Sequence, residues 1–229
     1  MSGYLIKICG LTRAEDAGMC ANLGVDWLGF IFHPSSRRKA DPGQVAAFET
    51  GLATRVGVFV DQTPADVRRI MAEARLDLAQ LHGDQGREFC QTVGPERIIK
   101  VFWPERYSEA AELSLAMADF AEAAAFFLLD AGKDGGGHGR HLASDTLAGL
   151  LSPRPWLLAG GLTPASVRDF AAKPPEGLIG FDFNSRVETS PGLKDSHMVA
   201  EAVEAVIGLD RSKKLFSALR KPIQSNKEV

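Results

Sequence analysis

Long apolar runs, paired cysteines and a strong charge of either sign are all missing from this chain of 229 residues. No apolar run approaches the roughly 20 residues that a membrane-spanning helix needs, so we expect no membrane partner. Its cysteines, Cys9, Cys20 and Cys90, are too few for a complete disulfide set and lack the paired spacing of a zinc site. The net charge of −3 argues against a nucleic-acid partner.

The composition is that of an ordinary globular protein, with 45% hydrophobic and 24% charged residues. The opening stretch, MSGYLIKICG, has neither the charged region nor the small-residue cleavage site of a secretory signal. These features together predict a cytoplasmic, reduced and metal-free protein. The length suits one α/β barrel or two small domains.

Eight short apolar runs recur at intervals of about 20 to 29 residues, and amphipathic segments separate them. The runs begin at Leu5, Trp27, Arg55, Leu78, Ile98, Phe126, Pro155 and Leu178. Several of the intervening segments open with a helix-start signal: Asp41, Thr63 and Thr163 each precede a proline, and Thr12 with Glu15 resembles a capping box. Evenly spaced strands and helices predict a single (β/α)8 TIM barrel over residues 1–209, with an open doubly wound sheet as the alternative. Residues 210–229 form a polar, basic tail that we place outside the barrel core.

Alternation along the strands predicts which side chains enter the barrel. The polar inward residues gather at the carboxyl ends of the strands, where barrel enzymes carry their chemistry: Lys7, Cys9, Gln80, His82, Asp130, Asp182 and Asn184. The first and eighth strands of a closed barrel are neighbours, so Lys7 and Asp182 can pair. Because a buried lysine needs such a partner, we interpret this pair as mainly structural.

Two residues at this mouth suit proton transfer. A thiol with a lowered pKa, such as Cys9, can abstract a proton, and a buried carboxylic acid, such as Asp130, can donate one. Cys9 alone is more often a small buried hydrophobe, which is also how we interpret Cys20 and Cys90. A redox role for Cys9 is disfavoured because no resolving cysteine lies nearby in the sequence.

Anion-binding features surround these residues. Gly160 and Gly161 close the seventh strand, where the loops of such barrels commonly bind phosphate, although the glycines can also merely turn the chain. Arg38, after the second strand, can clamp a carboxylate or phosphate, whereas we expect Arg37 to be solvated. The glycine-rich stretch AGKDGGGHGRHL after Asp130 is either a loop that closes over substrate or a plain connection.

Seven motifs occur in order over most of the barrel. They are KICGLT, GFIFHPSSRR, VGVFVD, QLHG, LLD before the glycine-rich loop, LAGGLTP and DFNSRVETSPGLKD. In this combination the chain closely resembles phosphoribosylanthranilate isomerases. The resemblance implies a TIM barrel of tryptophan biosynthesis that works without cofactor or metal. It would convert N-(5-phosphoribosyl)anthranilate into 1-(2-carboxyphenylamino)-1-deoxyribulose 5-phosphate by an Amadori rearrangement, as a monomer or homodimer.

The resemblance also implies roles for individual residues. Cys9 matches the general base, Asp130 the general acid and Arg38 the residue that holds the anthranilate carboxylate. The phosphate cradle matches Gly160, Gly161, Asn184 and Ser185, while Gln80 and His82 match residues lining the site.

The chain departs from the family pattern at two places. Arg186 stands where the family usually has glycine, so it either strains the backbone or adds a cation to the phosphate site. His138 stands where serine or threonine is common, and the usual Phe-Asp-Trp is absent. Two other functions remain open: an isomerase of the related histidine-pathway aminoaldose, which typically uses two aspartates, and a phosphate-ligand binding protein without turnover.

Overall fold

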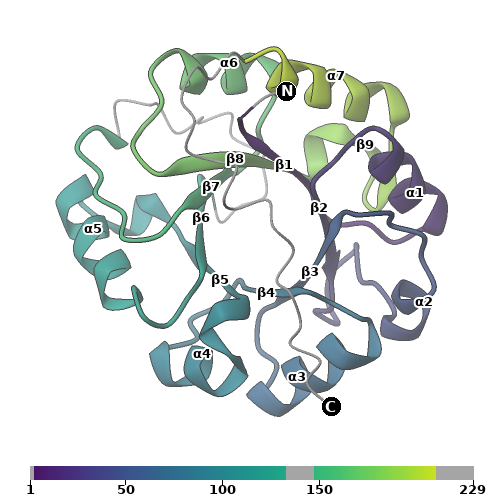
Figure 1. Cartoon of the computed structure of the whole chain (residues 1–229), viewed down its shortest axis with the longest axis horizontal. Helices are drawn as coiled ribbons and strands as arrows, with labels where there is room; N and C mark the ends of the chain where they lie inside the picture. The colour runs from purple at the N-terminus through teal and green to yellow at the C-terminus, as the bar shows by residue number, and fades with distance from the viewer. Residues whose placement is uncertain (1–2, 133–146, 210–229) are drawn as a thin grey trace.

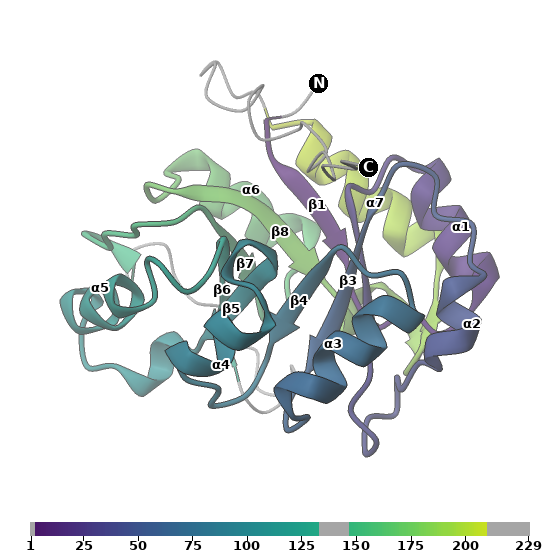
Figure 2. The ribbon, with the colours of Figure 1, turned by 60° about the horizontal axis from the view of Figure 1, so that its bottom comes forward.

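The chain folds into a closed barrel of parallel strands surrounded by helices (Figure 1). The computed structural model describes residues 3–132 and 147–209. The strands are β1 (Leu5–Ile8), β2 (Trp27–Ile31), β3 (Thr54–Phe59), β4 (Leu78–Leu81), β5 (Ile98–Phe102), β6 (Phe126–Asp130), β7 (Trp156–Ala159) and β8 (Leu178–Phe183). Each begins within one residue of its predicted position. The prediction of a (β/α)8 barrel is confirmed, and the open sheet is excluded because β1 pairs with β8 (Figure 2).

Helices follow most strands and cover the outside of the barrel. They are α1 (Ala14–Asn22), α2 (Pro42–Ala46), α3 (Pro64–Glu73), α4 (Arg87–Val93), α5 (Ala110–Asp119), α6 (Pro164–Ala172) and α7 (Ser196–Ile207), with short 3-10 turns η1 (Pro95–Arg97), η2 (Pro104–Arg106) and η4 (Ser185–Val187). The predicted caps at Asp41, Thr63 and Thr163 are confirmed, because each side chain accepts a backbone N–H of the first helical turn.

The capping box predicted at Thr12 is wrong. Arg13 occupies the N-cap position of helix α1, and its side chain makes no capping hydrogen bond. The Thr12 hydroxyl instead donates to the carbonyl of Gly192, 2.8 Å away, far along the sequence. A tertiary hydrogen bond therefore replaces the local one.

The core has two layers, as the alternation predicts. Outward residues such as Ile6 and Ile8 pack against the helices. Inward residues such as Val56, Leu78 and Leu128 fill the barrel itself. Because both faces of each strand are buried, the strands read as nearly continuous apolar runs, which is typical of parallel sheets.

A short antiparallel hairpin, β9 (Glu188–Ser190) with β10 (Leu193–Lys194), separates β8 from α7. Nothing in our sequence analysis predicted it. The Pro191-Gly192 pair between its strands is a turn signal that would have indicated it. Thr12 and Asp16, at the start of α1, contact its backbone, so the hairpin is fixed beside that helix.

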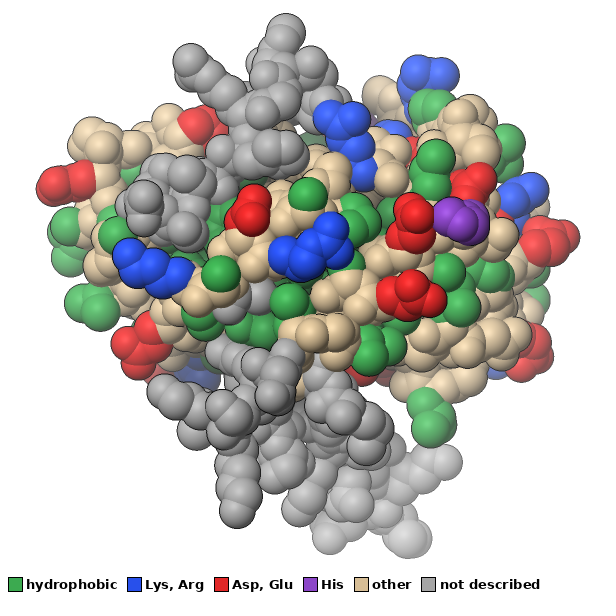
Figure 3. All heavy atoms as spheres, turned by 90° about the horizontal axis from the view of Figure 1, so that it is seen from above, with side chains coloured by type: hydrophobic (Ala, Val, Ile, Leu, Met, Phe, Trp, Pro, Cys, Tyr) green, Lys and Arg blue, Asp and Glu red, His purple; other side chains and the backbone are tan. Residues whose placement is uncertain are grey.

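The surface shown in Figure 3 carries acidic and basic side chains interspersed among apolar and polar ones. In the described part of the chain, no helix combines the length and apolar character required to cross a membrane. The predicted tail, residues 210–229, lies outside the described residues, as do residues 133–146 with His138.

Candidate active site

The carboxyl ends of the parallel strands meet at one mouth of the barrel, and the predicted polar residues are found there. Cys9 directly follows β1, His82 follows β4, Asp130 ends β6 and Asn184 follows β8. Since all eight strands run in the same direction, residues from distant parts of the sequence share this mouth.

Lys7 and Asp182 form the predicted pair inside the barrel. They lie opposite each other in the register between β1 and β8, with 2.9 Å between Lys7 Nζ and Asp182 Oδ2. Both side chains are buried, at 0% and 7% exposed. The second carboxylate oxygen, Asp182 Oδ1, and the amide oxygen of Gln80 have no hydrogen-bond partner among the described residues. Buried acceptors of this kind normally have a partner, so both oxygens are suited to receive donors from a ligand.

Cys9 is almost fully buried, at 4% exposed. Its side chain lies over Gly29 on the neighbouring strand, where a Cβ atom would stand only 2.8 Å from Cys9 Sγ. Burial raises the pKa of the thiol, and the charge and hydrogen bond of Lys7 oppose that rise. Lys7 is thus the main group that favours the thiolate form of Cys9.

Asp130 is set up to hold a proton. Its side chain is 15% exposed. Burial raises its pKa to about 6, helped by the charges of Asp182 and Glu105 and opposed by a hydrogen bond from the N–H of Gly132. A carboxyl group whose pKa is raised by burial can act as a general acid near neutral pH.

His82 lies between Gln80 and Asp130. Gln80 Nε2 is 3.2 Å from His82 Nδ1, and His82 Nε2 is 3.4 Å from Asp130 Oδ2. Burial, together with the charges of nearby cations, lowers the pKa of His82 to about 4, so the ring is neutral at pH 7. With the amide donating to Nδ1, the ring proton is on Nε2 and points toward Asp130. The contact between His82 and Asp130 is therefore not an ion pair at neutral pH.

Arg38 reaches the mouth from the loop after β2, where it pairs with a carboxylate. Its guanidinium binds the carboxylate of Glu188 with three contacts of 2.7 to 3.0 Å. Glu188 was not predicted as a site residue, although it lies within the motif DFNSRVETSPGLKD. Arg37 is exposed, as predicted.

The predicted phosphate residues lie at the ends of the adjacent strands β7 and β8. Gly160 and Gly161 have φ of 98° and 62°, a region that favours glycine. Ser185 is exposed and begins η4. The side-chain oxygen of Asn184, however, accepts a hydrogen bond from Lys194 Nζ at 3.2 Å, so that oxygen is already engaged.

Arg186 causes no left-handed strain. In residues 3–132 and 147–209, Arg75 is the one residue other than glycine with a positive φ. Of the two consequences considered for the replacement of glycine at this position, backbone strain is therefore excluded.

Comparison with known proteins agrees with this geometry. A family profile described as "N-(5'phosphoribosyl)anthranilate (PRA) isomerase" matches residues 6–205. The chain belongs to this family. It is 45% identical to the N-(5'-phosphoribosyl)anthranilate isomerase of Maridesulfovibrio salexigens over 204 residues, which cover 88% of this chain and 98% of that protein.

Solved structures of the family have the same fold. The phosphoribosyl anthranilate isomerase of Thermus thermophilus is 34% identical and aligns with a TM-score of 0.75, covering 90% of this chain and all of that one. A second isomerase structure, 28% identical with a TM-score of 0.72 and the same coverage, was solved in complex with reduced 1-(o-carboxyphenylamino)-1-deoxyribulose 5-phosphate.

Proposed function

We propose that this chain isomerises N-(5'-phosphoribosyl)anthranilate in tryptophan biosynthesis, with Asp130 as general acid and Cys9 as general base. The carboxylic acid of Asp130 protonates the furanose ring oxygen, and the ring opens to a Schiff base. The Cys9 thiolate then removes the proton from C2′, which gives an enolamine that tautomerises to the ketone. One proton enters and one leaves the substrate, so the product is an isomer.

The observation that carries this proposal is the placement of Cys9 and Asp130 at one mouth of the barrel, under the influence of one buried cation. Cys9 directly follows β1 and Asp130 ends β6, and the charge of Lys7 acts on the pKa of each. Lys7 therefore favours the ionised form of the base. Burial and the charge of Asp182 act in the opposite direction on Asp130 and keep it protonated to higher pH. The environment thus brings the pKa of the acid close to neutrality, while Lys7 limits the rise in the pKa of the base.

The substrate has three polar parts, and the site offers a partner for each. Arg38 suits the anthranilate carboxylate, and the glycines after β7 with Asn184 and Ser185 suit the phosphate. The partnerless oxygens of Asp182 and Gln80 suit the sugar hydroxyls, which would donate to them.

Further expectations accompany this function. The substrate is a small phosphorylated molecule, and the reaction needs neither metal nor cofactor. A monomeric or homodimeric state, a cytoplasmic location, and the absence of nucleic-acid or membrane partners stay predictions. The histidine-pathway reaction is disfavoured because its enzymes typically use two aspartates, whereas this chain has a thiol at Cys9.

Loss of anthranilate-type fluorescence from freshly generated N-(5'-phosphoribosyl)anthranilate tests the proposal. Cys9→Ala and Asp130→Asn should each reduce turnover by about 10²- to 10⁴-fold. Cys20→Ala and Cys90→Ala are matched controls, because both thiols are buried in helices α1 and α4, and they should keep the activity. A wild-type protein that binds the reduced product analogue but shows no turnover would instead support the binding-protein alternative.

A further inference from the structure

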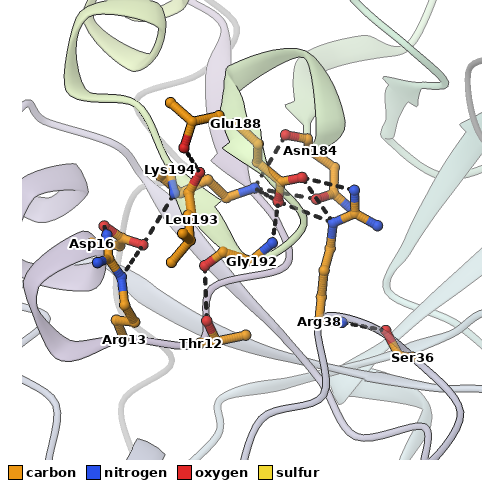
Figure 4. A network of polar contacts seen from close by, with 11 residues as sticks. Thr12, Arg13, Asp16, Ser36, Arg38, Asn184, Glu188, Gly192, Leu193 and Lys194 are labelled. Atoms are coloured by element: carbon orange, nitrogen blue, oxygen red, sulfur yellow. Dashed lines mark hydrogen bonds and ion pairs between the residues drawn. The ribbon is translucent and has the colours of Figure 1, made fainter.

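Three charged side chains from two distant segments meet beside the proposed active site (Figure 4). Arg38 comes from the loop after β2, while Glu188 and Lys194 come from the two strands of the β9–β10 hairpin. Glu188 accepts from Nε and Nη2 of Arg38, and its Oε1 also lies 2.7 Å from Lys194 Nζ. One carboxylate thus binds two cations at once.

The arrangement is buried on the hairpin side. The side chains of Lys194 and Glu188 are 0% and 2% exposed, whereas that of Arg38 is 22% exposed. Burial opposes ionisation of Glu188, but hydrogen bonds from Arg38 and Lys194 outweigh it and lower its pKa. The cluster contains two cations and one anion, so its net charge is positive, and Arg38 is the member nearest to solvent.

The cluster lies next to the catalytic strand. A Cβ atom on Gly10, the residue after Cys9, would stand 2.6 Å from Arg38 Cδ and 2.5 Å from Asn184 Oδ1. Lys194 Nζ binds both the carbonyl and the side-chain oxygen of Asn184, at 3.1 and 3.2 Å. The side chain of Arg38 therefore packs against the backbone of Gly10, which immediately follows the proposed base. Lys194 binds Asn184, which lies beside the same glycine.

A guanidinium has two edges that match a carboxylate. Glu188 occupies the edge formed by Nε and Nη2 of Arg38. A second carboxylate bound to the same guanidinium would use the edge formed by Nη1 and Nη2. A single glutamate on Arg38 would cancel its charge, and Lys194 is the group that restores an excess of positive charge.

We propose that Glu188 and Lys194 are positioning residues for the substrate carboxylate. Glu188 fixes the plane of Arg38 so that its second edge addresses the anthranilate carboxylate. Lys194 offsets the charge of Glu188, so that the substrate meets a net cation. This inference rests on the proposed function, in which Arg38 binds that carboxylate.

A purely structural role would have a different signature. If the cluster only fixed the hairpin, its removal would weaken all ligands alike or lower stability. If it orients Arg38, its removal weakens only ligands that carry the carboxylate. Two ligands separate these roles: reduced 1-(o-carboxyphenylamino)-1-deoxyribulose 5-phosphate, and the same compound without its carboxyl group.

The dissociation constants of both ligands would be measured by titration calorimetry for the wild type, Glu188→Gln and Lys194→Met. Both variants should lower the ratio of the affinity for the carboxylated ligand to that for the other ligand by about 10- to 100-fold, the range expected for hydrogen bonds to charged groups. Lys194→Arg, which keeps the charge, should recover most of the loss. Thr12→Val is the matched structural control, because it removes the 2.8 Å bond from Thr12 to the hairpin without touching the charges, and it should leave the ratio of the two affinities unchanged.

The two variants also distinguish positioning from simple charge. If Glu188→Gln binds the carboxylated ligand more tightly than the wild type does, the glutamate only competes with the substrate for Arg38, and the proposal is overturned. Equal weakening of both ligands by Glu188→Gln and Lys194→Met would overturn it as well. The near-isosteric Glu188→Gln keeps the test decisive if Lys194→Met does not fold.

Arg38→Met separates this inference from the proposed function. If this variant still prefers the carboxylated ligand as the wild type does, then the role assigned to Arg38 itself is wrong. If Arg38→Met loses the preference while the Glu188 and Lys194 variants keep it, only the positioning roles fail.

Discussion

Lys7 on β1 and Asp182 on β8 face each other inside the barrel, with 2.9 Å between Nζ and Oδ2, at the point where the sheet closes. Two buried charges are expensive to desolvate and are tolerated because they are paired. Lys7 also acts on the pKa of Cys9 and of Asp130. The pair, which the sequence alone indicates as mainly structural, is therefore also placed to influence the chemistry.

We expect Lys7→Met to destabilise the protein by about 3–5 kcal/mol, because Asp182 would remain buried without its partner. The double variant Lys7→Met/Asp182→Asn should recover much of that loss, measured as the free energy of unfolding in urea. Its turnover should stay low at neutral pH, and the alkaline limb of its kcat/KM profile should move to higher pH because the thiol has lost its cation. Full recovery of both stability and the pH profile would show that the pair is structural alone.

A methyl group at Gly10 should impair substrate binding. Gly10 has φ of 76°, and a Cβ there would collide with Arg38 and Asn184. Gly10→Ala should therefore raise KM by roughly tenfold, as expected when a charged hydrogen bond is misplaced, and cost about 1–2 kcal/mol of stability from the left-handed backbone alone.

Gly24→Ala is the matched control for that experiment. Gly24 has φ of 81°, but a Cβ there meets nothing within 4 Å. It should show the backbone cost in urea unfolding with an unchanged KM. Equal KM values for the two variants would mean that the contacts above Gly10 do not serve substrate binding.

Asp130→Asn should stabilise the protein above pH 6 while it removes activity. Because the pKa of Asp130 is raised from 3.8 to about 6 on folding, the folded state binds more protons than the unfolded state between these values. The resulting penalty is absent below pH 3.8 and complete above pH 6, where it amounts to about 3 kcal/mol. Unfolding in urea at pH 4 and pH 7.5 should show a gain for the variant at the higher pH that is nearly gone at the lower. A gain of the same size at both values would contradict this assignment.

The pH profile of kcat/KM should be bell-shaped. The acid limb reports Asp130, with a pKa of about 6, and the alkaline limb reports Cys9, whose pKa is raised from 9.0. Since the base has the higher pKa, the productive form, with a thiolate and a carboxylic acid, is the minor singly protonated species across the plateau.

The substrate phosphate, which titrates near pH 6, requires a control for that profile. If the limb near pH 6 belongs to Asp130, the residual activity of Asp130→Asn should instead rise in a single step toward the raised pKa of Cys9, because only the thiolate then limits turnover. A limb that persists near pH 6 in the variant belongs to the phosphate, and the assignment to Asp130 would then be wrong.

The sequence by itself determined the barrel and most of its mouth. Short-range periodicity predicts where the strands start and which side chains face inward or outward. Local hydrogen bonding predicts the caps at Asp41, Thr63 and Thr163. Both depend only on residues close together in the sequence. Because parallel strands end at one mouth, the order of the strands was enough to bring Cys9 and Asp130 together.

Only the tertiary structure decided how the charges pair and how strongly each group holds its proton. Arg38 and Glu188 are 150 residues apart in the sequence. The Thr12 hydroxyl donates to the carbonyl of Gly192, 180 residues away, and makes no local helix cap. Burial raises the pKa values of Cys9 and Asp130 and the charge of Lys7 opposes both rises, and neither effect is a property of the residues themselves. Long-range contacts and desolvation arise only once the chain is packed, because they depend on distances through space that no local pattern encodes.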